Sequence, residues 1–281
     1  MSRIAQCFAE LALARRAAFI PFITAGDPDA ATSLELLKSL PAAGADLIEL
    51  GVPFSDPMAD GPAIQASSQR ALKAGITLAK VLGLVREFRK ANQSTPLVLM
   101  GYFNPIHAMG VERFVKDAAA AGVDGLITVD LPPEEDVVLR VPAKAAGLEV
   151  VRLATPTSDE ERLTTILGNA GGFLYYVSVA GVTGTKTYSG DDVKAALARV
   201  RARAQIPVVV GFGIKTPEQA AEIARFADGA VVGSAIVARI AERDAEGVAP
   251  ARIVADVTAF CQSLATAVRA ARPPAVLGST S

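Results

Sequence analysis

The sequence has no tryptophan, a single histidine and only two cysteines among its 281 residues. Cys7 and Cys261 lie near opposite ends of the chain without the spacing of a disulfide framework or a zinc site, so we expect free thiols in a reducing compartment. His107, on an expected exposed loop, has no other histidine or cysteine nearby, and no metal site is predicted. Ser178 and Ser234 lack a histidine base, which argues against a serine hydrolase.

An excess of charge of one sign is also missing. The 28 basic and 29 acidic residues nearly cancel, and neither kind forms a long block. This balance argues against a nucleic-acid surface and against a face attracted to membranes. The first 14 residues lack a signal-peptide pattern, and no charge-free apolar span has the length of a membrane crossing. We therefore expect a cytoplasmic protein that binds neither nucleic acid nor membrane.

Short apolar runs, in contrast, recur along the whole chain. Eight runs occur at 19–23, 47–52, 97–101, 125–129, 148–153, 173–179, 207–211 and 229–233. Helical patterns alternate with them at about 30–43, 63–91 (two helices), 111–121, 134–146, 158–169, 191–203 and 217–226, and a last helix is expected over 249–271. Apolar residues at helical spacing from Ile4 to Leu11 predict a helix before the first run, and we expect this helix to close one end of the barrel that the runs form.

This alternation predicts an α/β protein: a single (β/α)8 TIM barrel over residues 1–271 with an additional N-terminal helix, followed by a disordered tail over 272–281. A phrase of the type AG-x-D recurs before strands at 43–50 and 121–129, with the variant FADG at 226–229, and indicates a helix C-cap glycine and a short connection. An open Rossmann sheet is the rival, weakened because the turn after the first strand is TAGDPDA and not GxGxxG.

Several polar residues suit local structural roles. Ser158 with Glu161, and Thr216 with Gln219, have the spacing of helix capping boxes. Asp130 precedes Leu-Pro-Pro, where it either caps a helix or braces a neighbouring loop.

The strongest candidate for an active site is the stretch 47–62, LIELGVPFSDPMADGP. Glu49 lies in the middle of a strand that is apolar on both faces, and a carboxylate there is costly unless it is paired, protonated or used. Facing the barrel interior, it should have a raised pKa, which suits a proton donor and acceptor; a structural carboxylate is the alternative. Asp60 follows in a loop stiffened by prolines, and its alternative role is that of a helix-start acid.

Glycines recur in the last three predicted loops at the carboxyl ends of the strands. Gly184, Gly213 and Gly233 permit a close backbone approach to an anion, and Ser234 is placed to cap a short helix beginning at Ala235. A phosphate site after strands seven and eight recurs in such barrels, so we expect a phosphorylated ligand, although these glycines also suit simple tight turns. The long loop 180–190 is a candidate lid over the substrate or an ordinary surface loop.

The assembled motifs resemble those of the α subunit of tryptophan synthase over essentially the whole chain. The stretches that carry the resemblance are PFITAGDP at 21–28, LIELGVPFSDPMADGPAIQ at 47–65, MGYFNPI at 100–106, DLPPEE at 130–135, YYVSVAGVTGTK at 175–186, GFGIKTPEQ at 211–219 and GSAIV at 233–237.

The resemblance implies a lyase that cleaves indole-3-glycerol phosphate to indole and glyceraldehyde 3-phosphate, with no cofactor in this subunit. Glu49 matches the general acid–base of the family, and Asp60 matches the acid near the indole N–H. The other matching positions are Phe22, Met100 and Phe212 around the indole, Tyr175 and Thr183 beside the reacting centre, and Gly184, Gly213, Gly233 and Ser234 around the phosphate.

The resemblance also implies a partner, a pyridoxal-phosphate β subunit that receives indole in an α2β2 tetramer. The positions that match its contact region are Pro53, Asp56, Asn104, Pro105 and His107, together with the 180–190 loop. Two rival hypotheses are a stand-alone lyase that releases indole and a non-catalytic barrel that binds a phosphorylated ligand. A metal-dependent or Schiff-base aldolase fails for want of metal ligands or a lysine within a strand.

Overall fold

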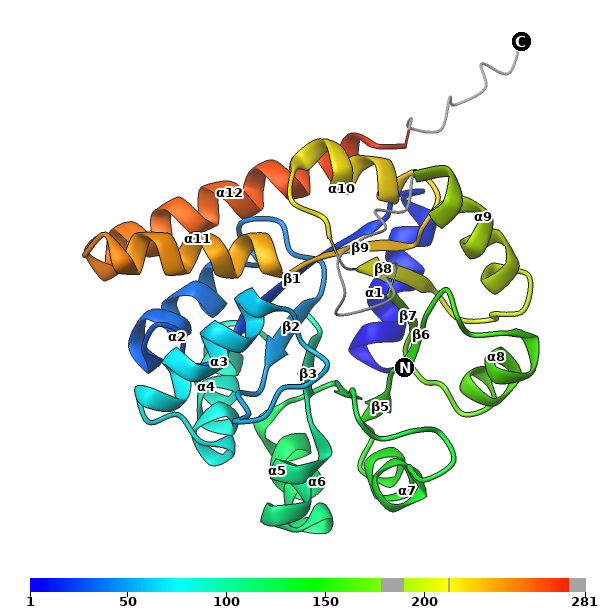
Figure 1. Cartoon of the computed structure of the whole chain (residues 1–281), viewed down its shortest axis with the longest axis horizontal. Helices are drawn as coiled ribbons and strands as arrows, with labels where there is room; N and C mark the ends of the chain where they lie inside the picture. Colours follow the sequence, from blue (N-terminus) through cyan, green and yellow to red (C-terminus); the bar gives the residue numbers. More distant parts are fainter. Residues whose placement is uncertain (178–189, 212, 273–281) are drawn as a thin grey trace.

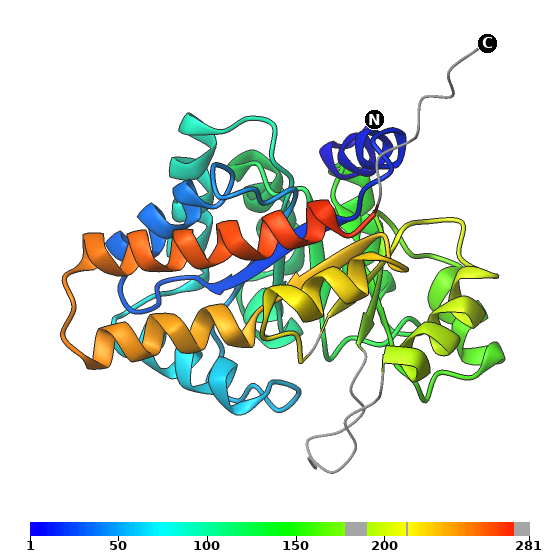
Figure 2. The same cartoon turned by 90° about the horizontal axis from the view of Figure 1, so that it is seen from above.

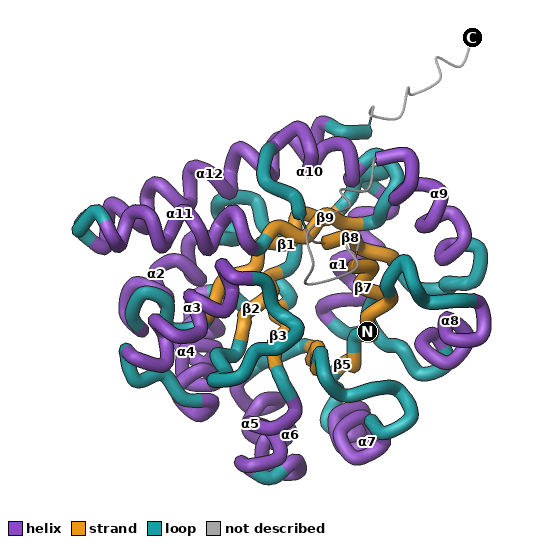
Figure 3. The backbone as a smooth tube through the Cα atoms, in the orientation of Figure 1, coloured by secondary structure: helices purple, strands orange, loops and turns teal. Residues whose placement is uncertain are grey.

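The computed structural model describes residues 1–177, 190–211 and 213–272. Its strands form one sheet, in the order β5-β4-β3-β2-β1-β9-β8-β7-β6, which curves into a nearly closed barrel inside a ring of helices (Figure 1, Figure 3). The predicted α/β barrel is confirmed. The strands are β1 (Ala18–Thr24), β2 (Ile48–Gly51), β3 (Leu97–Gly101), β4 (Gly125–Thr128), β5 (Glu149–Val150), β6 (Arg152–Ala154), β7 (Leu174–Val177), β8 (Val208–Gly211) and β9 (Gly229–Val232).

The helices alternate with the strands as the sequence pattern predicts, and the interval 63–91 holds two of them. Within the described part of the chain, no helix is both long enough and apolar enough to span a membrane. The helices are α1 (Arg3–Leu13), α2 (Ala30–Ser39), α3 (Pro62–Lys73), α4 (Leu78–Ala91), α5 (Phe103–Met109), α6 (Val111–Ala121), α7 (Val137–Ala145), α8 (Glu160–Leu167), α9 (Gly190–Arg201), α10 (Pro217–Ala224), α11 (Ser234–Ala245) and α12 (Pro250–Ala270).

The predicted single strand over 148–153 is wrong in detail, because the segment forms two short strands. β5 pairs only with β4, and β6 pairs only with β7, so the ladder changes neighbour at Val151. The Val151 N–H still donates to the Leu126 carbonyl over 3.0 Å, which holds the break against β4. The two pieces together take one strand position between β4 and β7, so the nine strands make eight positions around the barrel.

Three local predictions need correction and one is confirmed. Helix α8 is capped by Asp159, whose side chain accepts from the Arg162 N–H, whereas Ser158 accepts from the preceding turn. His107 lies in helix α5 and not in a loop. Ser234 is the first residue of α11, a helix of 12 residues, and does not cap it. The capping box of Thr216 is present as predicted.

The strand side chains alternate between two apolar layers, which fixes the direction of Glu49. Ile48 and Leu50 pack outward in the layer between the sheet and the helices. Leu47 packs inward with residues such as Val98 and Val209 from other strands. Because alternate residues share a face, Glu49 points into the barrel with Leu47, as predicted.

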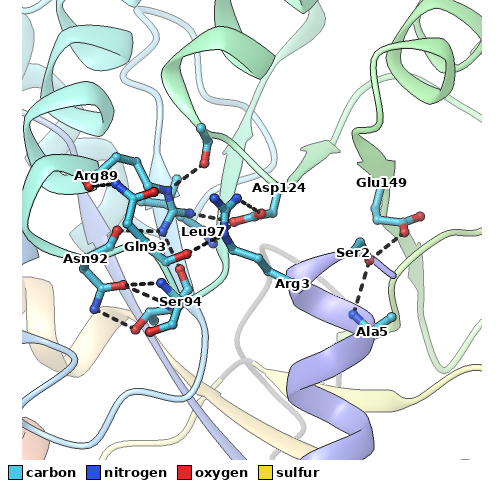
Figure 4. Close-up of polar contacts among 12 residues, drawn as sticks. Ser2, Arg3, Ala5, Arg89, Asn92, Gln93, Ser94, Leu97, Asp124 and Glu149 are labelled. Atoms are coloured by element: carbon cyan, nitrogen blue, oxygen red, sulfur yellow. Dashed lines mark hydrogen bonds and ion pairs between the residues drawn. The ribbon is translucent and has the colours of Figure 1, made fainter.

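Helix α1 closes the amino-terminal end of the barrel, as its apolar stripe predicts (Figure 2). Phe8 belongs to the interior cluster, and its ring lies 5.7 Å from that of Phe173. The Arg3 guanidinium lies 2.8 Å from the Asp124 carboxylate just before β4, and the Ser2 hydroxyl donates to Glu149 at the start of β5 (Figure 4). These polar contacts fix the helix across the strand starts.

The aspartates of the AG-x-D phrases join neighbouring strands at this same end. Each carboxylate accepts a hydrogen bond from the backbone N–H at or next to the start of a neighbouring strand. The pairs are Asp46 with Phe19 at 2.9 Å, Asp124 with Leu97 at 2.8 Å and Asp228 with Val208 at 2.9 Å. Each carboxylate also pairs with arginine: Asp46 with Arg16, Asp124 with Arg3 and Arg89, and Asp228 with Arg201. Repeated hydrogen bonds and ion pairs of these aspartates thus link the strand starts, and the pair of Arg89 with Asp124 is buried.

Candidate active site

A cavity of about 330 Å³ opens at the carboxyl ends of the strands. Its walls are mostly apolar, with two carboxylates on one side. The lining residues are Phe22, Glu49, Ala59, Asp60, Gly61, Ile64, Met100, Val129, Leu153, Thr155, Tyr175, Val177, Gly213, Ile214, Val231, Gly233 and Ser234. The structure therefore brings together every predicted catalytic and substrate-binding residue that it describes.

Glu49 is 2 % exposed, and its Oε1 atom has no hydrogen-bond partner among the described residues. Its strand neighbours in register are Phe22 on β1 and Val98 on β3, neither of which offers a charge or a side-chain donor. Burial, and secondarily the charge of Asp60, raises the pKa of Glu49 to about 8. A carboxyl group with such a pKa exchanges a proton readily near neutral pH.

Asp60 is held differently from Glu49. The Tyr102 hydroxyl donates to its Oδ2 atom over 3.1 Å and accepts from the Ala59 N–H over 3.0 Å. Burial raises the pKa of Asp60, and the hydrogen bond from Tyr102 opposes that rise. The ring of Phe54 lies 5.1 Å from that of Tyr102, so the loop after β2 is packed against the end of β3.

Two aromatic side chains occupy the space left by glycines on neighbouring strands. A Cβ atom at Gly51 would lie 2.5 Å from the Phe22 ring, and one at Gly211 would overlap the Tyr175 hydroxyl. Burial first, and then the charges of Glu49 and Asp60, raise the pKa of Tyr175 well above its ordinary value. Tyr175 therefore stays a neutral hydrogen-bonding group in the cavity.

Another part of the cavity wall presents a helix N-terminus. Helix α11 begins at Ser234, and its N-cap is Gly233, which has no side chain to accept from the N–H groups of the first turn. Gly213 has a φ of 82°, a conformation that favours glycine, and lines the same cavity. Exposed N–H groups and the helix dipole at such a position favour an anionic group.

Some predicted residues lie outside this cavity or outside the described residues. Thr183 and Gly184, with most of the 180–190 loop, and Phe212 fall outside the described residues, as does all of the predicted tail except Arg272. Of the predicted partner positions, the exposed ones are Asp56, Asn104 and His107, while Pro105 is half-buried and Pro53 is buried within this chain.

Of the two roles open for Asp130, its contact with the first residue of helix α5 favours helix capping. Its carboxylate accepts from the Phe103 N–H over 2.8 Å and so links the end of β4 to the start of α5. Tyr102 is the main site residue that sequence reasoning does not assign. Its position directly after β3, at the end of the barrel where chemistry is expected, is the signal that points to it.

The fold and the cavity define a class: a (β/α)8 enzyme with a buried and a half-buried acid in a cavity at the carboxyl ends of its strands, suited to proton transfer. Residues 8–269 match the family described as tryptophan synthase alpha chain. The chain belongs to this family.

Solved structures agree with this assignment. Tryptophan synthase subunit alpha from Legionella pneumophila str. Paris is 41% identical, with a TM-score of 0.89, over 95% of this chain and 98% of that one. Tryptophan synthase from Mycobacterium tuberculosis is 36% identical, with a TM-score of 0.85, over 95% and 98% of the two chains. The protein is accordingly a carbon–carbon lyase that cleaves indole-3-glycerol phosphate in tryptophan biosynthesis, and its family implies a β-subunit partner.

Proposed function

We propose that Glu49 is the general acid–base of this cleavage and that Asp60 stabilises the charge on the indole ring. The observation that carries the proposal is the buried, unpartnered oxygen of Glu49 in a cavity that also holds Asp60. An acid with a pKa of about 8 delivers a proton to carbon and, once ionised, removes one from a hydroxyl group.

The proton transfers follow in two steps. Protonated Glu49 gives its proton to the indole ring carbon that bears the glycerol chain, and the positive charge that develops on the ring nitrogen is stabilised by the Asp60 carboxylate. The Glu49 carboxylate then takes the proton of the adjacent glycerol hydroxyl. The O–H electrons form the aldehyde carbonyl, the carbon–carbon bond breaks, and its electron pair restores the aromatic ring. Glu49 ends protonated, as it began.

The apolar part of the cavity wall suits the indole ring of the substrate, and the anion-binding part suits its phosphate. Phe22, Met100 and Tyr175 line the part of the cavity next to Glu49, which suits the indole ring. Gly213, Gly233 and Ser234 lie where the N-terminus of α11 suits the phosphate. From the family resemblance, Phe212 would join the indole wall, Thr183 the reacting centre and Gly184 the phosphate cradle.

The proposed assembly is an α2β2 tetramer in the cytoplasm. This chain would use no cofactor of its own, and pyridoxal phosphate would be held by the β subunit. The contact positions are proposed from the resemblance, and the exposure of Asp56, Asn104 and His107 supports them. Pro53, being buried, would act through the loop that it shapes and not by direct contact.

An indole-release assay with purified chain, alone and with a cognate β subunit, tests the proposal. Cleavage that rises at least tenfold with the β subunit supports the tetramer, whereas equal, rapid turnover by the chain alone would favour a stand-alone lyase. Binding of a phosphorylated analogue without any indole release, in either condition, would refute the assignment of Glu49 and Asp60.

A further inference from the structure

A second and larger cavity, of about 800 Å³, lies at the amino-terminal end of the barrel, away from the catalytic one. It is bounded by α1, by the turn into β1, by the connections into β8 and β9, and by the end of α12. Its apolar part includes Phe8, Leu11 and Ile206. Four arginines and one aspartate line it: Arg15, Arg16, Arg201, Arg272 and Asp228.

Two of these arginines are neutralised by carboxylates. Both Nη atoms of Arg16 donate to Asp46, at 2.9 and 2.7 Å, and Nη2 of Arg201 donates to Asp228 at 2.7 Å. These pairs belong to the aspartate contacts that hold the strand starts together. The other two arginines of the cavity, Arg15 and Arg272, take no part in these pairs.

The remaining two arginines have no carboxylate partner among the described residues. Arg272 donates to the backbone carbonyls of Ala224 and Ala227, which are neutral acceptors. Burial, and to a lesser degree the charge of Arg201, lowers the pKa of Arg272 against the opposing effect of Asp228. The Arg15 side chain forms no hydrogen bond or ion pair with any described residue. The cavity therefore carries two guanidinium groups with which no carboxylate of the described chain forms an ion pair.

The backbone at Arg15 is a second and independent sign of function. The Arg15 N–H donates to Ala12, and the Arg16 N–H donates to Leu11, in the pattern of a Schellman motif at the end of α1. Arg15 has a φ of 50°, the one positive value at a non-glycine residue in the described chain. Glycine is the usual residue there, so an arginine adds strain and a cationic side chain at the mouth of this cavity.

We propose that this cavity is a binding site for a phosphate monoester with an apolar or aromatic body. A phosphate monoester carries a charge of about −2 near neutral pH, which matches the two guanidinium groups that lack a carboxylate partner. Guanidinium groups bind phosphate oxygens through paired N–H donors, and the apolar wall formed by Phe8, Leu11 and Ile206 accommodates the organic part. The site is separate from Glu49, at the other end of the barrel.

The test is an NMR titration of the full chain with phenyl phosphate, and with phenol as the uncharged probe. The amides of Arg15, Gln205 and Asp228 should shift in a saturable way with phenyl phosphate and not with phenol. Arg15→Gly is the decisive variant, because glycine suits the local backbone, so the chain should fold with an unchanged or higher melting temperature. It should weaken binding at these amides about tenfold and leave indole release unchanged.

Arg86→Gln, on the exposed face of α4, is the control for the loss of one positive charge, and its affinity should equal that of the unmodified chain. Equal affinity in the Arg15→Gly variant would overturn the proposal. So would shifts confined to the amides around Gly233 and Ser234, which would place the only phosphate site in the catalytic cavity. Equal shifts with phenol would show that the charge of the ligand is not recognised.

Discussion

The Tyr102 hydroxyl lies 3.1 Å from Oδ2 of Asp60 and donates a hydrogen bond to it. The same hydroxyl accepts from the Ala59 N–H, so one side chain at the end of β3 holds both the carboxylate and the backbone of its loop. Asp60 thus has a fixed orientation that does not depend on Glu49. The two acids differ because one is held by a donor and the other is left without one.

Tyr102→Phe should therefore impair Asp60 specifically. Without the hydrogen bond that lowers it, the pKa of Asp60 rises further, and the Ala59 N–H loses its acceptor. We expect kcat/KM for indole release to fall about tenfold, the effect of one hydrogen bond to a charged group. Introduced into an Asp60→Asn background, the same change should have little further effect; full additivity would contradict this link.

Glu49→Gln should remove catalysis while the fold survives. The amide has the shape of the carboxyl group but cannot carry a proton, so kcat should fall at least about 100-fold, within the range of general acid–base catalysis. Binding of an analogue that lacks the glycerol hydroxyls should persist, measured by calorimetry. Glu112→Gln on the exposed surface of α6 is the control. Near-normal turnover in the Glu49 variant would rule out the proposed role.

The raised pKa of Glu49 makes stability depend on pH. Its pKa is about 8 when folded and near the ordinary 4.5 when unfolded, so the folded state holds the extra proton between these values. The contribution of this group is then fully favourable below about pH 4.5 and is lost as the pH rises through about 8.

Glu49→Gln should accordingly raise the free energy of unfolding relative to the unmodified chain, by more at pH 9 than at pH 6. Urea unfolding at the two values measures the difference. A gain that is the same at both values, or a larger gain at pH 6, would show that the carboxyl group is not desolvated as the structure has it.

Gly51→Ala should displace the Phe22 ring, because the new methyl group would lie 2.5 Å from it. We expect a loss of about 1–3 kcal/mol of stability from overpacking, together with a higher KM for the indole substrate. Gly83→Ala is the matched control, since its methyl group meets only the far end of the Arg86 side chain at 3.9 Å, and it should stabilise helix α4 slightly. Thermal unfolding and kinetics of both variants test the difference.

Asp124→Ala should strongly destabilise the fold. Asp124 accepts from Arg3, Arg89 and the Leu97 N–H, and its removal leaves the Arg89 guanidinium, whose side chain is only 7% exposed, without its carboxylate. We expect a loss of about 3–5 kcal/mol in urea unfolding. Asp117→Ala, which removes an exposed ion pair on α6, should cost less than about 1 kcal/mol. Similar losses in both variants would contradict the anchoring role.

The barrel, the helix α1 that closes its amino-terminal end and the inward direction of Glu49 follow from periodicity in the sequence. Each apolar run is long enough to mark a strand, and the alternation around Glu49 assigns it a face. The break at Val151 could not be predicted, because it depends on which neighbour each half of the strand pairs with.

The roles of Asp46, Asp124 and Asp228 also required the structure. Their AG-x-D phrases indicate a turn, but their hydrogen bonds reach strands that are about 20–27 residues away in the sequence. The position of Tyr102 after β3 could be read from the sequence, but its contact with Asp60 could not, since Asp60 lies 42 residues earlier. Local pattern predicts elements and faces, and contacts between distant elements depend on the tertiary fold.

Helix α1 blocks the amino-terminal end of the barrel, because Phe8 and Leu11 pack among the interior side chains. In the described part of the chain, the cavity that holds Glu49 opens at the opposite end, where the loop with Asp56 and helix α5 with Asn104 also lie. A partner bound at that end would receive indole directly at the opening of the catalytic cavity, and indole would need no route through the barrel.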